Sequence, residues 1–253
     1  MKPEKGKLFV FEGGDGTGKT DQHKKLVARL SSEGYKVAEI DFPRYGTPPQ
    51  GHPASYFERK YLIKKEFGFE RGYGPANLVN PYAASLQYAV DRFDASFSEE
   101  YGDEPNLWDL LNDDHILVSN RYTQSNIAYQ ASRIKDREER IKFIQWLYDL
   151  EYEKLGIPEP NLVILLDLEP ELAMELKVRQ RREQGIELDD LEKDLANYVR
   201  STNAYLEALE LFANSWVKIE VGRKVHSSMD ILAGMHTREV IHEKIWSEVK
   251  KYL

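Results

Sequence analysis

The sequence predicts an α/β protein in which a five-stranded parallel sheet is covered by helices on both faces. Short runs of buried-strand character alternate with longer helical segments, and this alternation is typical of a parallel sheet with crossover helices. A glycine-rich turn at residues 13–20 stands between the first strand and the first helix. The 253 residues contain no repeat or linker, so we expect one domain, residues 1–253, with insertions.

The expected strands are short apolar runs bounded by polar or turn-forming residues. Because their apolar residues are nearly continuous rather than alternating, we expect the strands to be buried on both faces. The runs are Leu8–Phe11, Tyr35–Ile40, Ile116–Val118, Leu162–Leu166 and Trp216–Val221.

The expected helices carry apolar residues at intervals of three or four, which places them on one helical face. Three such sets stand out, after the first strand, before the fourth strand and at the C-terminus. They are His23, Leu26, Val27 and Leu30; Ile141, Ile144, Tyr148, Tyr152 and Leu155; and Ile241, Ile245 and Val249.

Two segments do not follow this alternation. Residues 45–80 are rich in glycine, proline and aromatic residues, which predicts an irregular excursion over the edge of the sheet. Residues 177–194 are crowded with charge, beginning with KVRQRREQG. Long charged excursions are either solvated surface or mobile lids.

Composition excludes several classes of protein. The chain has no cysteine, which removes disulfides, thiol nucleophiles and thiolate metal sites and fits a cytoplasmic protein. The formal net charge of −8 argues against a general nucleic-acid surface, although a site for a small phosphorylated molecule needs only a few arginines. The longest apolar run is five residues, far short of the roughly 20 of a membrane helix, and the N-terminus does not resemble a signal peptide.

The strongest motif is FEGGDGTGKT, residues 11–20, which contains G-x-x-x-x-G-K-[ST] between a strand and a helix. Its backbone N–H groups and the helix N-terminus suit phosphate oxygens, which predicts a nucleoside triphosphate site in a P-loop NTPase fold. Lys19 would reach the β- and γ-phosphates, and the Thr20 hydroxyl would bind Mg²⁺. The expected ATP-binding residues are Gly13, Gly14, Asp15, Gly16, Thr17, Gly18, Lys19 and Thr20.

The P-loop alone does not define the reaction, because switches, motor ATPases and small-molecule kinases share it. The chain lacks the N-K-x-D sequence that reads guanine. Asp167 closes the fourth strand and is either part of the metal's surroundings or a polar strand end.

Cationic side chains follow the strands at the edge where ligands of open α/β sheets bind. Arg44 lies after the second strand and Arg121 after the third, and with Lys19 we expect them to converge. Three cations beside a triphosphate site suit a second phosphorylated ligand. The alternative is that Arg44 and Arg121 are surface ion-pair partners.

Four segments together resemble the thymidylate kinase family of P-loop nucleoside monophosphate kinases. They are FEGGDGTGKT, FPRY at 42–45, the helical segment ending in DRF at 91–93, and NRYTQSNIAYQ at 120–130. The resemblance covers the chain from Lys7 to the C-terminal helix. It implies phosphorylation of dTMP to dTDP with ATP and Mg²⁺, a step in nucleotide biosynthesis that supplies dTTP, and it implies a homodimer.

The resemblance also implies roles for individual residues. Arg121 would bind the acceptor phosphate with Arg44 and Tyr45 nearby, and Tyr88 would stack on the pyrimidine. Arg92 and Asn126 would read the base, Tyr129 would favour deoxyribose and Asp15 would bind the 3′-hydroxyl. The expected dTMP site is therefore Asp15, Phe42, Arg44, Tyr45, Tyr88, Arg92, Arg121, Asn126 and Tyr129.

The resemblance implies that the charged segment, residues 177–194, corresponds to the family's lid over the donor nucleotide. Because Gly16 follows Asp15, the P-loop itself carries no arginine, and the cation would come from the lid. Phosphoryl transfer spreads negative charge that an arginine can stabilise. The expected catalytic residues are Lys19, Arg121, Arg179, Arg181 and Arg182, without a choice among the last three.

One position departs from the family pattern. The family segment usually reads D-R-[YH], whereas this chain has Asn120-Arg121-Tyr122. An uncharged Asn120 implies a shifted metal arrangement, lower activity or another acceptor. The alternatives are therefore a P-loop kinase for another nucleotide or deoxynucleoside, and an ATP-binding sensor without turnover.

Overall fold

The computed structural model describes residues 5–98, 105–183, 195–223 and 233–253. Its centre is a five-stranded sheet with the order β2-β3-β1-β4-β5, and every neighbouring pair is parallel. This confirms the predicted fold class and all five strands. The strands are β1 (Lys7–Gly13), β2 (Val37–Asp41), β3 (Ile116–Asn120), β4 (Leu162–Leu168) and β5 (Trp216–Gly222).

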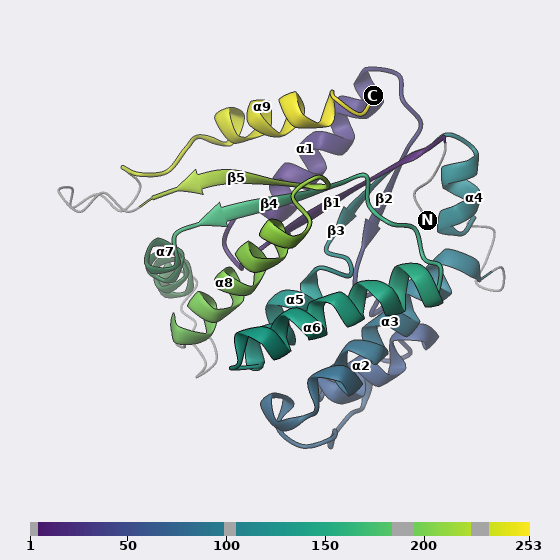
Figure 1. The fold of residues 1–253 in the computed structure, drawn as a ribbon, viewed down its shortest axis with the longest axis vertical. Helices are drawn as coiled ribbons and strands as arrows, with labels where there is room; N and C mark the ends of the chain where they lie inside the picture. The colour runs from purple at the N-terminus through teal and green to yellow at the C-terminus, as the bar shows by residue number, and fades with distance from the viewer. Residues whose placement is uncertain (1–4, 99–104, 184–194, 224–232) are drawn as a thin grey trace.

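Helices cover both faces of the sheet, which gives the molecule three layers (Figure 1). On one face α1 packs with α9, and on the other α3, α5, α6 and α8 lie together (Figure 1). The helices are α1 (Lys19–Ser32), α2 (Tyr56–Tyr61), α3 (Pro81–Phe97), α4 (Leu107–Asn112), α5 (Ser125–Tyr129), α6 (Arg137–Tyr148), α7 (Pro170–Glu183), α8 (Leu195–Leu211) and α9 (Arg238–Val249).

The sheet separates two hydrophobic cores. Successive side chains of a strand point to opposite faces, so Leu8 and Val10 enter one core while Phe9 and Phe11 enter the other. The central strands β1 and β4 are buried almost throughout, whereas the edge strand β2 is half exposed. The P-loop therefore begins at the end of the most rigidly packed part of the fold.

Two elements are shorter than the sequence predicted. The second strand begins at Val37, because Tyr35 lies in the preceding turn and is 40% exposed. The helix predicted through residue 155 is α-helical only to Tyr148 and then continues as a π-helix, Asp149–Lys154. Periodicity alone does not distinguish an α-helix from a π-helical continuation of the same apolar face.

The segment 45–80 forms the expected excursion and contains α2 with three single 3₁₀ turns. It reaches the lower edge of the molecule beside α3 (Figure 1). The 3₁₀ turns of the described chain are Pro53–Ser55, Lys65–Phe67, Ala76–Leu78 and Ala131–Arg133. Across the described ranges, no helix is both long and apolar enough to cross a membrane.

Candidate functional site

The P-loop connects β1 to α1 at the carboxyl end of the sheet. Gly18 has a φ of 82°, a left-handed conformation that glycine adopts without steric cost, and α1 begins at the next residue. Gly14 is close to Tyr198 of α8, so that a Cβ on Gly14 would lie 2.2 Å from the tyrosine hydroxyl. The loop therefore requires glycine both for its turn and for its contact with α8.

The Lys19 side chain folds back onto this loop. Its Nζ donates hydrogen bonds to the carbonyl oxygens of Gly13 and Gly14, each over 2.8 Å, and the residue is 7% exposed. Burial, followed by the positive charge of Arg121, lowers the pKa of Lys19 to about 8. A phosphate group would offer the ammonium group stronger, charge-assisted acceptors than these two carbonyls.

Arg121 follows β3 directly and joins the P-loop to α5. Its guanidinium donates to the Tyr129 hydroxyl over 2.7 Å and to Oδ1 of Asp15 over 3.2 Å. Its backbone has a φ of 69°, a left-handed conformation that is strained for a residue with a Cβ. Such strain is frequent at functional sites, where the surrounding structure holds it in place.

Glu12 is a buried carboxylate that sequence reasoning missed. It is 0% exposed and accepts hydrogen bonds from the Tyr122 backbone N–H, the Ser125 hydroxyl and the Tyr205 hydroxyl. Burial raises the pKa of Glu12, against the opposing effects of Tyr205 and Arg121. The carboxylate ties the segment after β3 to the strand that carries the P-loop. A glutamate within an otherwise buried strand was the available sequence signal.

Arg44 is engaged by two carboxylates of α3. Its Nε donates to Oδ1 of Asp91 over 2.8 Å, and its Nη2 donates to Oδ2 of Asp94 over 2.6 Å. The Arg44 backbone N–H also donates to Asp91 over 2.8 Å. The structure thus gives Arg44 the ion pairs that the alternative interpretation expected, and Asp91 fixes both its backbone and its side chain.

The residues expected to read the base come from two helices. Tyr88 and Arg92 lie on α3, and Asn126 lies on α5, where its Nδ2 is 3.5 Å from the Ser85 carbonyl oxygen of α3. Burial raises the pKa of Tyr88, and Tyr45 and Arg92 are near enough to affect it.

Arg92 and Phe42 are both buried. Two guanidinium nitrogens of Arg92 are bound by Glu151. Phe42 is 3% exposed and packs edge-to-face on Tyr122, with 5.5 Å between ring centroids. Its side chain therefore lies in the core beneath the segment after β3.

The expected lid falls only partly within the described chain. Residues 184–194 and the Arg181 side chain lie outside it. Arg179 and Arg182 are exposed on α7, and Nε of Arg179 donates to Oε1 of Glu183 over 3.0 Å. The helix that bears them follows β4 and lies at the carboxyl end of β4 and β5 (Figure 1).

The possible metal ligands are few. Among the described residues, no three His, Cys, Asp or Glu side chains gather in a way that could hold a metal ion. Asp167 is 7% exposed and forms an ion pair with Arg223 over 2.5 Å, which fits a polar strand end. Thr20 is exposed in the first turn of α1.

Comparison with known proteins identifies the family. The thymidylate kinase family model matches residues 71–230, which is more than half of the chain. The chain belongs to the thymidylate kinase family. It is 30% identical to the thymidylate kinase of Mycobacterium tuberculosis (strain CDC 1551 / Oshkosh) over 210 residues, covering 83% of this chain and 87% of that relative. It is 27% identical to the thymidylate kinase of Thermoanaerobacter sp. (strain X514) over 250 residues, covering 98% of this chain and all of the relative.

Two solved thymidylate kinases share the fold of this family member. The enzyme from Candida albicans superposes with a TM-score of 0.61 at 21% identity, covering 98% of this chain and 92% of the other. The enzyme from Ehrlichia chaffeensis superposes with a TM-score of 0.58 at 19% identity, covering 97% and 99%. The three-layer fold predicted from the strand and helix pattern is therefore confirmed.

Proposed function

We propose that this thymidylate kinase family member transfers the γ-phosphoryl group of ATP to dTMP, which yields dTDP and ADP. The observation that carries the proposal is the bond between Arg121 and Asp15, 3.2 Å long, which places a cation suited to an acceptor phosphate against the P-loop. Both groups lie at the carboxyl end of the sheet, where α/β proteins bind ligands.

The chemistry would consist of positioning and charge neutralisation. A phosphate oxygen of the acceptor attacks the γ-phosphorus, and the bond to the oxygen bridging the β- and γ-phosphates breaks as ADP leaves. The P-loop N–H groups and Lys19 would hold the donor, and Arg121 would hold the acceptor phosphate. No covalent intermediate on the protein is needed.

The acceptor nucleoside would lie between α3 and α5. Tyr88 would stack on the base, which favours binding without choosing among bases. The choice would come from Arg92 and Asn126, because a wrong base leaves their buried donors unpaired. Tyr129 would lie against the deoxyribose, and Asp15 would accept a hydrogen bond from the 3′-hydroxyl. The paired Arg44 would act with Tyr45 at the edge of the site.

Mg²⁺ would be held by the Thr20 hydroxyl together with phosphate oxygens and water. This fits an exposed hydroxyl in the first turn of α1. The ion would supply positive charge that neutralises the phosphate oxygens of the donor. Arg179, Arg181 and Arg182 would add positive charge from a lid over residues 177–194 within a single kinase domain. Closure would exclude water and so prevent hydrolysis of ATP.

We further propose a cytoplasmic homodimer. The support is a row of exposed apolar side chains along one side of α3, which would be covered by a second copy. They are 42–49% exposed: Leu86 45%, Val90 49%, Phe93 43% and Phe97 42%. A net charge of −8 gives no support for a nucleic-acid partner.

ADP release with ATP and Mg²⁺ tests the function across dTMP, dUMP, UMP, dCMP, AMP and thymidine. We expect preferential turnover of dTMP. Arg121→Ala should abolish acceptor phosphorylation while ATP binding persists, whereas Arg29→Ala, which removes an exposed pair with Glu243, should change neither. Turnover of another acceptor would overturn the assignment of Arg92 and Asn126 as the residues that read the base. Intact ATP binding without ADP release for any acceptor would indicate a sensor.

A further inference from the structure

The observation is a fully buried ion pair between α3 and the π-helix. Nε of Arg92 donates to Oε2 of Glu151 over 2.5 Å, and Nη2 of Arg92 donates to Oε1 over 2.7 Å. The side chains are 3% and 0% exposed. Both carboxylate oxygens are thus used in a bidentate contact, which fixes the guanidinium in its plane as well as in position.

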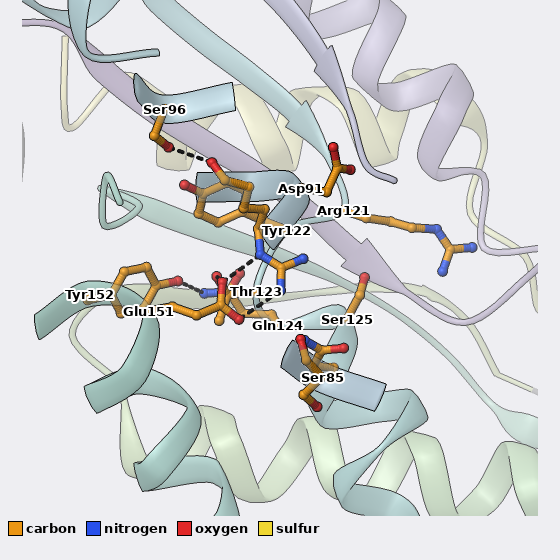
Figure 2. Close-up of polar contacts among 12 residues, drawn as sticks. Ser85, Asp91, Ser96, Arg121, Tyr122, Thr123, Gln124, Ser125, Glu151 and Tyr152 are labelled. Atoms are coloured by element: carbon orange, nitrogen blue, oxygen red, sulfur yellow. Dashed lines mark hydrogen bonds and ion pairs between the residues drawn. The ribbon is translucent and has the colours of Figure 1, made fainter. Parts of the chain in front are cut away.

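Further contacts hold Glu151 itself. The Thr123 hydroxyl donates to Oε2 of Glu151 over 2.8 Å, and Nε2 of Gln124 donates to the neighbouring Tyr152 hydroxyl over 2.9 Å. Glu151 and Tyr152 thus point from the π-helix toward Thr123 and Gln124, which follow Arg121 in the chain (Figure 2). The network therefore links α3 to the segment that carries the expected phosphate-binding arginine.

The backbone that presents Glu151 is unusual. The Leu155 N–H donates to the Leu150 carbonyl oxygen, five residues earlier, which is the π-helical pattern. Single π-helical turns within helices are rare and occur frequently at functional sites. The turn buries Glu151 and Tyr152 together on the side that faces Thr123 and Gln124.

Stability alone is a weak reason for such a pair. A buried ion pair often contributes no more to folding than well-packed apolar residues of similar volume, because both charges must be desolvated. A bidentate pair does, however, define the direction of every guanidinium N–H. With one N–H of Nε and one of Nη2 bound by Glu151, the remaining N–H groups of Arg92, one on Nη2 and two on Nη1, have fixed directions in which to meet a ligand, and the Tyr122 ring lies 5.9 Å from the guanidinium carbon.

We propose that Glu151 is a positioning residue, which orients Arg92 so that one N–H group is presented to the base of the acceptor. The proposal rests on the proposed function, in which Arg92 contacts that base. A fixed donor matches a carbonyl oxygen, such as O4 of thymine, and opposes an amino group, such as N4 of cytosine. Glu151 would therefore act on the choice of base without touching the nucleotide.

Glu151→Gln tests this with kcat and KM measured separately for dTMP, dCMP and ATP. The amide cannot accept both guanidinium N–H groups, so the Arg92 plane is released. We expect the KM for dTMP to rise about tenfold, as for the loss of a charge-assisted bond, and the preference for dTMP over dCMP to fall by a similar factor. The KM for ATP should stay within twofold of its original value. An unchanged preference would overturn the proposal.

Glu207→Gln is the matched control. Glu207 forms the same bidentate pair with Arg140, over 2.6 and 2.7 Å, between α6 and α8. The Glu207→Gln variant should leave the preference for dTMP over dCMP unchanged. An equal loss in both variants would indicate general loosening of the fold and would overturn the positioning role.

A double-mutant cycle tests whether Glu151 acts through Arg92. Residues that act as a unit show non-additive losses. In an Arg92→Gln background, Glu151→Gln should change the KM for dTMP less than twofold, and full additivity would overturn the proposal.

Thr123→Val replaces Glu151→Gln as the test if the latter variant does not fold, because it removes one hydrogen bond to Glu151. A lowered preference for dTMP over dCMP would support the proposal, and an unchanged preference would overturn it. Absence of dTMP turnover in the unmodified enzyme would instead refute the proposed function.

Discussion

The Nδ2 group of Asn120 donates a hydrogen bond to Oδ1 of Asp41 across 3.1 Å, between the ends of the neighbouring strands β3 and β2. The uncharged residue that departs from the family pattern therefore lies beside a carboxylate from another strand. Burial raises the pKa of Asp41, whereas the charges of Arg121 and His23 oppose that rise. A carboxyl group therefore lies at this edge of the sheet although residue 120 supplies none.

The first prediction concerns this carboxyl group. Asp41→Asn should lower kcat/KM for dTMP about tenfold or more, equivalent to roughly 1.4 kcal/mol, because the cations near the P-loop lose a counter-charge. The exchange variant, Asp41→Asn with Asn120→Asp, should recover most of the rate, since it returns one carboxylate to the same edge. Steady-state kinetics of the three proteins checks this, and an undiminished rate in Asp41→Asn would contradict it.

The second prediction concerns the pH dependence of ATP binding. The free enzyme holds the pKa of Lys19 at about 8, mainly through burial, and a bound phosphate raises it because the charged amine is then paired. Binding therefore takes up a proton above pH 8, so affinity falls as the pH rises. We expect the Kd for ATP to increase about tenfold between pH 7.5 and 9.5 by linkage. Lys19→Arg, which stays charged, should give a Kd for ATP that does not change over this pH range. The same pH dependence in both proteins would refute the assignment of this effect to Lys19.

The third prediction concerns Glu58 of α2, which is 0% exposed and has two carboxylate oxygens without a hydrogen-bond partner among the described residues. Burial, followed by the charge of Asp91, raises the pKa of Glu58 to about 9. Between pH 4.5 and 9 the folded chain holds a proton that the unfolded chain releases, so this group lowers stability progressively as the pH rises.

Glu58→Gln should remove that dependence. We expect the variant to be more stable than the unmodified protein by at least about 1 kcal/mol at pH 8.5, a difference that disappears near pH 4.5. Urea unfolding at several pH values measures it. Equal pH slopes for the two proteins would show that Glu58 is ionised in the folded state.

The fourth prediction concerns the apolar row on α3. Val90→Glu should shift the protein from dimer to monomer in sedimentation equilibrium, because a charge would be buried at the contact between copies. Val240→Glu is the matched control, since Val240 is a valine of α9 with a similar exposure, 45% against 49%. A dimeric Val90→Glu variant would place the contact elsewhere, and a monomeric unmodified protein would refute the proposed homodimer.

Local patterns were sufficient for the fold class. The five strands and the P-loop helix were predictable because apolar periodicity and glycine placement act over a few residues. The position of cations after the strands predicted that Lys19, Arg44 and Arg121 would converge at one edge of the sheet. It could not show that Arg121 binds both Asp15 and Tyr129, because side-chain direction depends on the strained backbone after β3.

The buried carboxylates were beyond local reasoning. Tyr205 reaches Glu12 across 193 residues of sequence, and Thr123 reaches Glu151 across 28. The sequence gives no sign that Asp91, rather than solvent, binds Arg44. A buried charge is defined by its partners, and those partners come from separate elements.

The sequence by itself determined a parallel α/β fold and a nucleotide-binding P-loop, because each depends on short-range spacing, and four motifs carried the resemblance to the thymidylate kinase family. Only the tertiary structure decided which charges are paired, that Asp41 stands beside Asn120, and that Glu151 binds the arginine expected to read the base. These relationships arise where strands and helices distant in the chain pack together, and there burial gives each charged contact its strength.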